Sequence, residues 1–202
     1  MAGGKSRRMG QDKLPLELGG VPLIMRVLRA LESSCEELLI VGGDSPSPSL
    51  RARHVPDLRW TNAGPLAGIE AGLRAARRPS VFVAAGDVPF LSERLVKFLL
   101  GLLAERGVPA VVPYQGGRLH PLCAAYGRDA VLPAVKTALD SGVRAVREVV
   151  GGLPGVMYVE ERELRAFGDP ARLLMNVNSP EDLARARAML LDESWGRGGE
   201  GR

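Results

Sequence analysis

A chain of 202 residues with 46% hydrophobic side chains can bury one substantial core, and no apolar run approaches the roughly 20 residues of a membrane span. Its two cysteines lie far apart and argue against a disulfide framework; because no signal-peptide pattern is present, we expect a cytoplasmic protein. The net charge of +4 suits anionic ligands, but only 4% of the residues are aromatic and the arginines are dispersed, which disfavours a nucleic-acid-binding protein.

Strand-like and helix-like segments alternate along the chain. Short apolar runs predict strands at 38–41, 80–85, 109–113, 122–126, 156–159 and 173–177. Helical periodicity predicts helices at 22–34, 66–77, 92–105, 129–140, 144–150 and 179–191. This alternation predicts an α/β fold, a three-layer, doubly wound, mostly parallel sheet that binds its ligands at the carboxyl ends of the strands.

The clearest helix start is at residues 179–182. Ser179 stands at the N-cap, Pro180 at the first helical position, and Asp182 completes a capping box. Arginines of the predicted helices, such as Arg74 and Arg185, are expected on solvated faces.

The sequence opens with a dense glycine-basic segment, MAGGKSRRMGQDK. Glycines let the backbone approach a phosphate and turn its N–H groups toward it. Arg7, Arg8 and Lys13 add charge-assisted contacts to phosphate oxygens. For an arbitrary chain, a frayed basic terminus would be the simpler interpretation, and the spacing matches neither a Walker A loop nor the dinucleotide-binding fingerprint.

Asp87 follows the predicted strand at 80–85 in the segment GDVPF. A carboxylate at a strand end points into the ligand crevice. Beside phosphate-binding glycines it suits Mg²⁺, which proteins usually hold with one or two carboxylates plus substrate phosphates. The alternative interpretation is an ordinary turn or helix-capping aspartate.

Two further segments lie at expected strand ends. NAGPLAG, residues 62–68, leads into a helix whose first amide groups can face an anion or a base. NVNSPED, residues 176–182, places Asn176 and Asn178 just before a well-capped helix. Turn formation is the usual explanation for either segment taken alone. The alternative is that the two asparagines are metal or substrate ligands at a strand end.

Together and in this order, these segments resemble the molybdenum cofactor guanylyltransferase family of nucleotidyltransferases, over about residues 1–190. The matching stretches are AGGKSRRMGQDK (2–13), GPLAGI (64–69), AAGDVPF (84–90), HPLCAAY (120–126) and NVNSPEDL (176–183). The resemblance implies a fold like that of the nucleotide-diphospho-sugar transferases.

The resemblance also implies roles for individual residues. The opening loop would contact GTP with Met1, Ala2, Gly3 and Gly4. Lys13 and Arg8 would act catalytically on the phosphates, and Asp57 would contact the nucleoside. Asp87 would be catalytic as the ligand of Mg²⁺, with Asn178 near the metal and the second substrate. Contacts to the pterin substrate would come from three further residues, His120, Arg144 and Arg147.

The implied reaction transfers GMP from GTP to the terminal phosphate of molybdopterin cofactor, and a cofactor-synthesis protein could hand that cofactor over. Positioning and charge neutralisation carry most of the catalysis in such transfers. The alternatives are a cytidylyltransferase or other sugar or pterin nucleotidyltransferase of the same group, and a non-catalytic nucleotide-binding protein.

The sequence departs from the family pattern at its start. The family has a hydrophobic strand before the glycine loop, whereas this sequence begins at Met1 inside the loop. We therefore expect the first strand to be missing and the true start to lie upstream. We expect one nucleotidyltransferase domain over residues 1–192 and a disordered, glycine-rich tail over 193–202.

Overall fold

The computed structural model describes residues 16–42, 52–56, 58–59 and 64–196, and their side chains as far as residue 191. Its strands are β1 (Glu17–Leu18), β2 (Val21–Pro22), β3 (Leu38–Val41), β4 (Ala52–Val55), β5 (Ser80–Ala84), β6 (Ala110–Gln115), β7 (Arg118–Leu119), β8 (Cys123–Gly127) and β9 (Met157–Glu160). Its α-helices are α1 (Leu23–Glu32), α2 (Gly64–Ala75), α3 (Glu93–Arg106), α4 (Arg128–Asp140), α5 (Val146–Gly152), α6 (Glu161–Leu164), α7 (Pro170–Leu173) and α8 (Pro180–Gly196).

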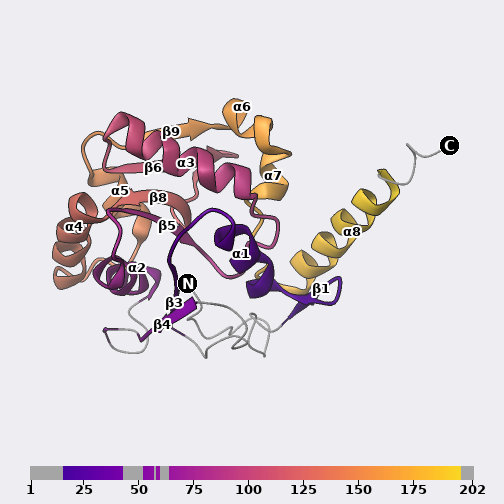
Figure 1. Ribbon diagram of the computed structural model, residues 1–202, viewed down its shortest axis with the longest axis horizontal. Helices are drawn as coiled ribbons and strands as arrows, with labels where there is room; N and C mark the ends of the chain where they lie inside the picture. The colour runs from indigo at the N-terminus through magenta and orange to yellow at the C-terminus, as the bar shows by residue number, and fades with distance from the viewer. Residues whose placement is uncertain (1–15, 43–51, 57, 60–63, 197–202) are drawn as a thin grey trace.

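The centre of the fold is a sheet in the order β5–β8–β6, with β7 and β9 both paired to β6 (Figure 1). β9 runs parallel to β6, whereas β8 runs antiparallel to both of its neighbours, so that β5, β6 and β9 share one direction. The reversal of β8 follows from chain length. Residues 116–122 alone connect β6 to β8, and a parallel return needs a crossover of about a dozen residues or more.

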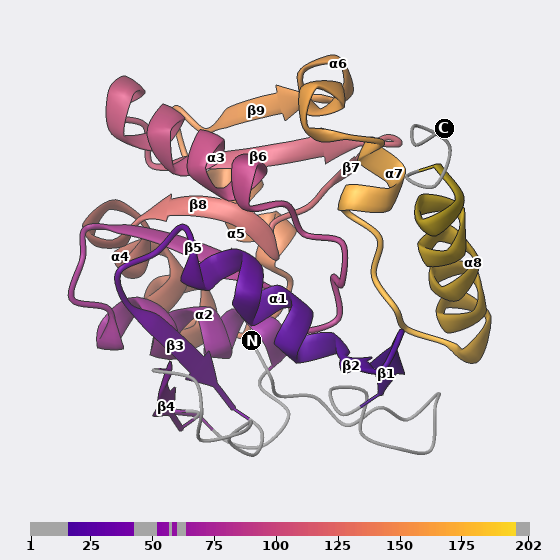
Figure 2. The ribbon, with the colours of Figure 1, turned by 45° about the vertical axis from the view of Figure 1, so that its right-hand side comes forward.

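Helices cover both faces of this sheet, as Figure 2 shows. α1 and α3 lie on one face, where Leu95 and Leu99 pack against Val111 of β6. α2, α4 and α5 lie on the other, where they pack against the neighbouring β6 residues Ala110 and Val112. The alternation along β6 is what a strand buried on both sides requires. The three-layer α/β fold predicted from the sequence is confirmed.

β3 and β4 form a separate parallel pair, and within the described ranges neither strand pairs with the central sheet. A groove of about 470 Å³ lies between β3 and β5, and its walls include Leu38 and Val41 on one side and Val81 and Val83 on the other. Residues of α2 and α3 line it as well. The groove is lined mainly by apolar side chains, and within the described ranges it separates the β3–β4 pair from the central sheet.

The predicted strand at 173–177 is wrong. Asp169 Oδ1 accepts a hydrogen bond of 3.1 Å from the backbone N of Ala171 and so caps α7, which takes up Leu173. The residues after it follow an irregular path to α8. The apolar run is buried because it packs under helices, with Met175 and Val177 among residues of α8 and β1.

The start of α8 agrees with the sequence. The backbone N of Asp182 donates to Ser179 Oγ (3.2 Å), and the backbone N of Ser179 donates to Asp182 Oδ2 (3.0 Å), which confirms the predicted capping box. The helix continues to Gly196, beyond the domain end that we expected at residue 192.

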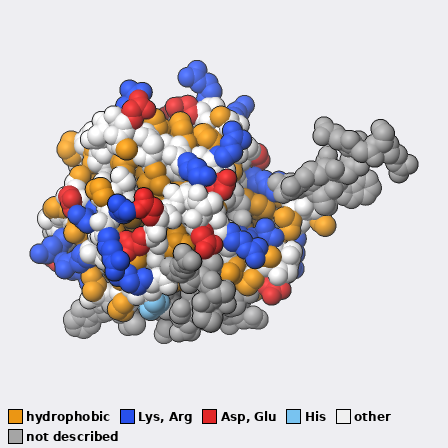
Figure 3. Space-filling model, viewed as in Figure 1, with side chains coloured by type: hydrophobic (Ala, Val, Ile, Leu, Met, Phe, Trp, Pro, Cys, Tyr) orange, Lys and Arg blue, Asp and Glu red, His pale blue; other side chains and the backbone are white. Residues whose placement is uncertain are grey.

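The surface in Figure 3 carries basic and acidic side chains side by side, with no continuous basic patch on that face of the described chain. Several arginines lie in ion pairs; Arg53 contacts Glu37 and Arg78 contacts Glu36. Among the described residues, no helix is long and apolar enough to cross a membrane.

Candidate functional site

Asp87 lies where the chain leaves β5, directly after the buried Ala85 and Gly86. Asn176 Nδ2 donates a hydrogen bond of 2.9 Å to Asp87 Oδ1, and the backbone N of Val177 donates to the carbonyl oxygen of Asp87, also at 2.9 Å. Two of the motifs singled out in the sequence, 84–90 and 176–183, are therefore adjacent in space.

The asparagine that contacts the carboxylate is Asn176, to which the family resemblance gave no role. The resemblance had pointed to Asn178 instead. The backbone N of Asn178 donates to Asp182 Oδ2 (2.9 Å), so this residue also takes part in the start of α8. The amide of Asn176 helps to fix the direction of the Asp87 carboxyl group.

A cavity of about 320 Å³ adjoins this contact. It is lined by Pro65, Val88, Leu119, His120, Pro121, Leu122, Cys123, Ala145, Val146, Arg147, Leu174 and Asn176. Most of these residues are apolar, and three polar side chains converge on the same space, which is typical of a site for a small organic ligand. Those three are His120, Arg147 and Asn176.

His120 carries the most notable polar atom of the cavity. Its Nε2 is buried and has no hydrogen-bond partner among the described residues. Burial lowers the pKa of the imidazole, Arg118 lowers it further, and a hydrogen bond with the backbone of Gln115 opposes both effects. The ring is therefore neutral at pH 7, and its unpaired nitrogen can exchange a hydrogen bond with a ligand.

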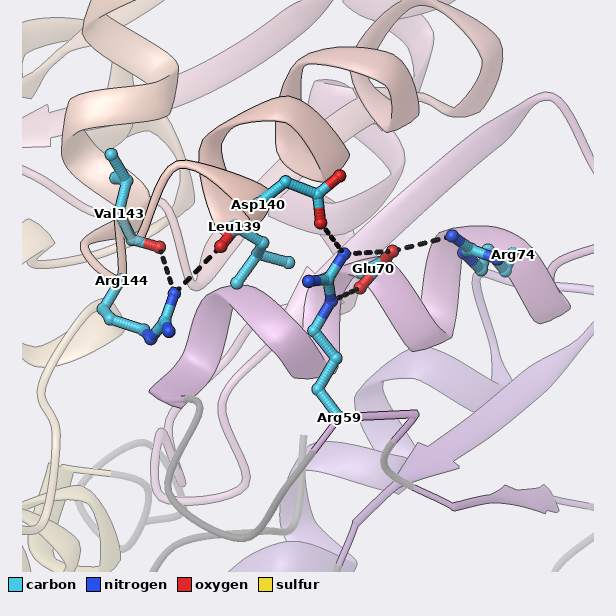
Figure 4. Close-up of polar contacts among 7 residues, drawn as sticks. All are labelled: Arg59, Glu70, Arg74, Leu139, Asp140, Val143 and Arg144. Atoms are coloured by element: carbon cyan, nitrogen blue, oxygen red, sulfur yellow. Dashed lines mark hydrogen bonds and ion pairs between the residues drawn. The ribbon is translucent and has the colours of Figure 1, made fainter.

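Arg144 and Arg147 differ in position although both were predicted to contact the pterin substrate. Arg147 lines the cavity. Arg144 does not, and its Nη1 donates to the carbonyl oxygens of Leu139 (3.2 Å) and Val143 (3.1 Å), as Figure 4 shows. These contacts satisfy carbonyl groups at the end of α4. The contact of Arg144 with substrate stays a prediction.

A cluster of charged side chains, which we call the Arg59 clamp, consists of Arg59, Glu70, Arg74 and Asp140 (Figure 4). Glu70 is 1% exposed and is the one charged side chain that is buried among those described. It contacts Arg59 at 2.5 Å and Arg74 at 2.8 Å. This cluster was not predicted from the sequence. Arg74 is exposed, as expected, and it also pairs with Glu70 through the i,i+4 spacing of a helical ion pair.

Both cysteines are free, in agreement with the expectation of no disulfide framework. Burial raises the pKa of the Cys123 thiol to about 12 and also raises the pKa of the Cys35 thiol. Neither thiol is a thiolate at neutral pH, so Cys123 contributes only its volume to the cavity wall.

Several predicted site residues lie outside the described residues. They are Met1, Ala2, Gly3, Gly4, Arg8, Lys13 and Asp57. Within the described part of the chain, no group of three or more His, Cys, Asp or Glu side chains could hold a metal ion.

The α/β fold, the carboxylate at the end of β5 and the adjoining cavity define a nucleotidyltransferase-like protein. The 2-C-methyl-D-erythritol 4-phosphate cytidylyltransferase of Thermus thermophilus shares the fold with a TM-score of 0.68 at 24% identity, over 89% of this chain and 94% of that one.

The chain belongs to the family of the MobA-like NTP transferase domain, whose model matches residues 1–155. This confirms the resemblance inferred from the motifs. A probable molybdenum cofactor guanylyltransferase of Pelotomaculum thermopropionicum is 37% identical over 98% of this chain and 94% of that protein. A molybdenum cofactor guanylyltransferase of Desulfosudis oleivorans is 33% identical over 94% of this chain and 93% of that protein.

The crystal structure of the molybdopterin-guanine dinucleotide biosynthesis protein A of Archaeoglobus fulgidus is also similar. It superposes with a TM-score of 0.80 at 29% identity and covers 95% of this chain and 96% of that one.

Proposed function

We propose that this protein transfers GMP from GTP to the terminal phosphate of molybdopterin cofactor, which yields the guanine dinucleotide form of the cofactor and pyrophosphate. Relatives named for this activity align over nearly the whole chain. The observation that carries the proposal is the position of Asn176, whose amide holds Asp87 and which also lines the cavity of His120 and Arg147. One residue thus joins the predicted triphosphate side of the site to the predicted pterin side.

Asp87 is the residue that would hold Mg²⁺. It supplies one carboxylate at a strand end and is half-buried, and the donor set fits an ion that usually takes one or two carboxylates together with substrate phosphates. Asn176 already fixes the direction of that carboxyl group, as partners of metal ligands commonly do. Bound there, Mg²⁺ would offset the negative charge of the triphosphate.

The reaction needs two polyanions to meet. An oxygen of the cofactor phosphate attacks the α-phosphorus of GTP, a new P–O bond forms, and the bond from that phosphorus to the bridging oxygen of the β-phosphate breaks. The electron pair leaves with pyrophosphate. Arg8 and Lys13 would neutralise phosphate charge, and the opening glycines would turn backbone N–H groups toward it.

The cavity would position the acceptor. The pterin is flat and rich in nitrogen donors and acceptors, and the cavity offers apolar walls with three convergent polar groups. His120, neutral at pH 7, would exchange a hydrogen bond with the ring system, while Arg147 would attract the anionic end of the cofactor. Asp57 would contact the nucleoside, and Asn178 would lie near the metal.

We further propose that residues 1–192 form a single nucleotidyltransferase domain. The protein would act in the cytoplasm and receive molybdopterin cofactor from a cofactor-synthesis protein.

The direct test is pyrophosphate release in the presence of molybdopterin cofactor, with GTP and CTP compared at equal concentration and with Mg²⁺ added or chelated. We expect release from GTP only, and only with Mg²⁺. Release from CTP alone would favour the cytidylyltransferase alternative. GTP binding in calorimetry without any turnover would favour a non-catalytic nucleotide-binding protein.

A variant sharpens this test. Lys13→Ala should lose turnover while its circular dichroism spectrum stays that of the parent, because the lysine is expected to act on phosphates and not in the core. Unchanged pyrophosphate release by this variant would contradict the role of the opening segment. Arg165→Ala is a matched control, since it removes a cation from a surface ion pair with Glu161 and should leave turnover unchanged.

A further inference from the structure

The Arg59 clamp connects three parts of the chain. Glu70 lies in the middle of α2, Arg59 follows β4, and Asp140 is the last residue of α4. Arg59 Nε contacts Glu70 Oε2 at 2.5 Å, and Arg59 Nη2 contacts both Glu70 Oε1 at 3.2 Å and Asp140 Oδ1 at 2.9 Å. One guanidinium group therefore lies between two carboxylates from different helices, as Figure 4 shows.

The two helices that the clamp joins each lead to a wall of the cavity. α2 begins at Gly64, and the next residue, Pro65, lines the cavity. α4 ends at Asp140, and the segment that follows it reaches Ala145 and the cavity residue Arg147. The start of α2 and the α4–α5 connection also lie close together. A Cβ atom added to Gly64 would be in van der Waals contact, at 3.8 Å, with the carbonyl oxygen of Arg144.

The burial of Glu70 makes this connection stiff. A buried carboxylate is costly unless it is paired, and removing one partner of such a pair is strongly unfavourable. Arg59 has only 26% of its side chain exposed, and its planar group contacts Glu70 through two nitrogens, which restricts its orientation. Asp140 is 55% exposed, so its contact is the weaker end of the clamp.

We propose that Arg59 is a positioning residue that fixes the spacing between the start of α2 and the α4–α5 connection, and so sets the width of the cavity that receives the pterin substrate. Arg59 does not line the cavity and acts through the two walls that it joins. This inference rests on the proposed function for the identity of the substrate, whereas the mechanical link itself does not depend on it.

Asp140→Asn is the sharpest variant, because it weakens the link to α4 while Glu70 keeps both of its arginines. We expect the KM for molybdopterin cofactor to rise about threefold, the size that a partly exposed ion pair can contribute, with kcat and the melting temperature nearly unchanged. Arg59→Met removes both contacts and should raise this KM about tenfold. Arg59→Lys, which keeps the charge but not the two-nitrogen contact, should fall between the two.

Hydrogen exchange of the protein without substrates provides a readout that is independent of the proposed function. Arg59→Met should speed exchange of backbone amides at 144–147, whereas the control Arg165→Met, which breaks a surface ion pair with Glu161 of α6, should not. Faster exchange there together with an unaltered substrate KM would overturn the positioning role, and so would unaltered exchange. If the parent protein released no pyrophosphate from GTP, the proposed function would fail, while the exchange result would still decide whether the clamp links the two walls.

Discussion

Two carboxylates of the fold, Glu70 on α2 and Asp87 after β5, are held in different ways. Glu70 is buried and lies between two arginines, so its charge is neutralised within the fold. Asp87 is half-buried at the end of β5, and its carboxyl group accepts a hydrogen bond from the amide of Asn176, which also lines the cavity. A buried carboxylate between two arginines serves the structure, whereas a half-buried carboxylate at a strand end beside a cavity is placed to act on a ligand. Substitutions at these positions should therefore separate stability from turnover.

The largest expected effect is that of Asp87→Ala on turnover. If Asp87 holds Mg²⁺ on the triphosphate, its loss should lower kcat by at least about 100-fold, the scale of removing one electrostatic stabiliser of a transition state. Circular dichroism and thermal melting should remain close to the parent because the side chain is not part of the core. An unfolded variant, or one with unchanged pyrophosphate release, would remove the distinction drawn between the two carboxylates.

Asn176→Ala should have the next largest effect. Loss of the partner that orients a metal ligand typically costs about 10- to 100-fold in activity or metal affinity. The dependence of kcat on Mg²⁺ concentration should shift to higher concentrations, which can be measured by pyrophosphate release during a metal titration. Leu191→Ala serves as a control, since that side chain is 66% exposed on α8. An unshifted metal titration would speak against the role of the amide.

Glu70→Gln should affect stability before it affects turnover. Both arginines lose a charged partner, and we expect the free energy of unfolding to fall by about 2 kcal/mol, as for lost hydrogen bonds to charged groups. Contacts with Arg59 lower the pKa of Glu70. Its contribution is therefore present above the unfolded-state pKa of about 4.3 and is lost as the pH falls through the lower folded-state pKa. Urea unfolding at several acidic pH values should show that the free energy of unfolding falls less steeply with falling pH for Glu70→Gln than for the parent. An equal fall in both proteins would contradict the assignment.

Substitution of His120 should have the smallest effect, which is a change in how the free energy of unfolding depends on pH. Burial lowers the pKa of this imidazole in the folded state, so the unfolded chain takes up a proton first as the pH falls. The destabilisation begins near the unfolded-state pKa of about 6.5 and grows until the folded-state pKa is reached. His120→Gln should remove this part of the pH dependence in thermal melting between pH 7 and 5. A parent and variant with parallel curves would show that His120 does not titrate in this way.

The sequence predicted most of the central elements because their signals are local. Periodicity placed the long helices within a few residues, and the Ser179–Asp182 capping box was confirmed at α8. The β1–β2 hairpin was not predicted: its strands have two residues each, and its turn depends on Gly19 and Gly20, both at positive φ. The direction of β8 could have been predicted from the short connection that precedes it.

The candidate site was predicted unevenly for a similar reason. Asp87 could be found because a strand end and a glycine mark it in the sequence. The choice between Asn176 and Asn178 could not be made, because it depends on which of two side chains in an irregular segment faces β5. The burial of Glu70 depends on Arg59 and Asp140, which meet it only in the folded chain.

The groove beside β3 has a consequence for how the protein opens. β8 has a hydrogen-bonded neighbour on each edge, whereas β3, within the described ranges, has one partner strand, and its other side faces the groove. Regions with fewer packed neighbours exchange amide protons through smaller local openings. Under native conditions the amides of β3 and β4 should therefore exchange as a separate, less protected unit. Local unfolding and protease cleavage should accordingly occur at β3 and β4 before they occur at β8.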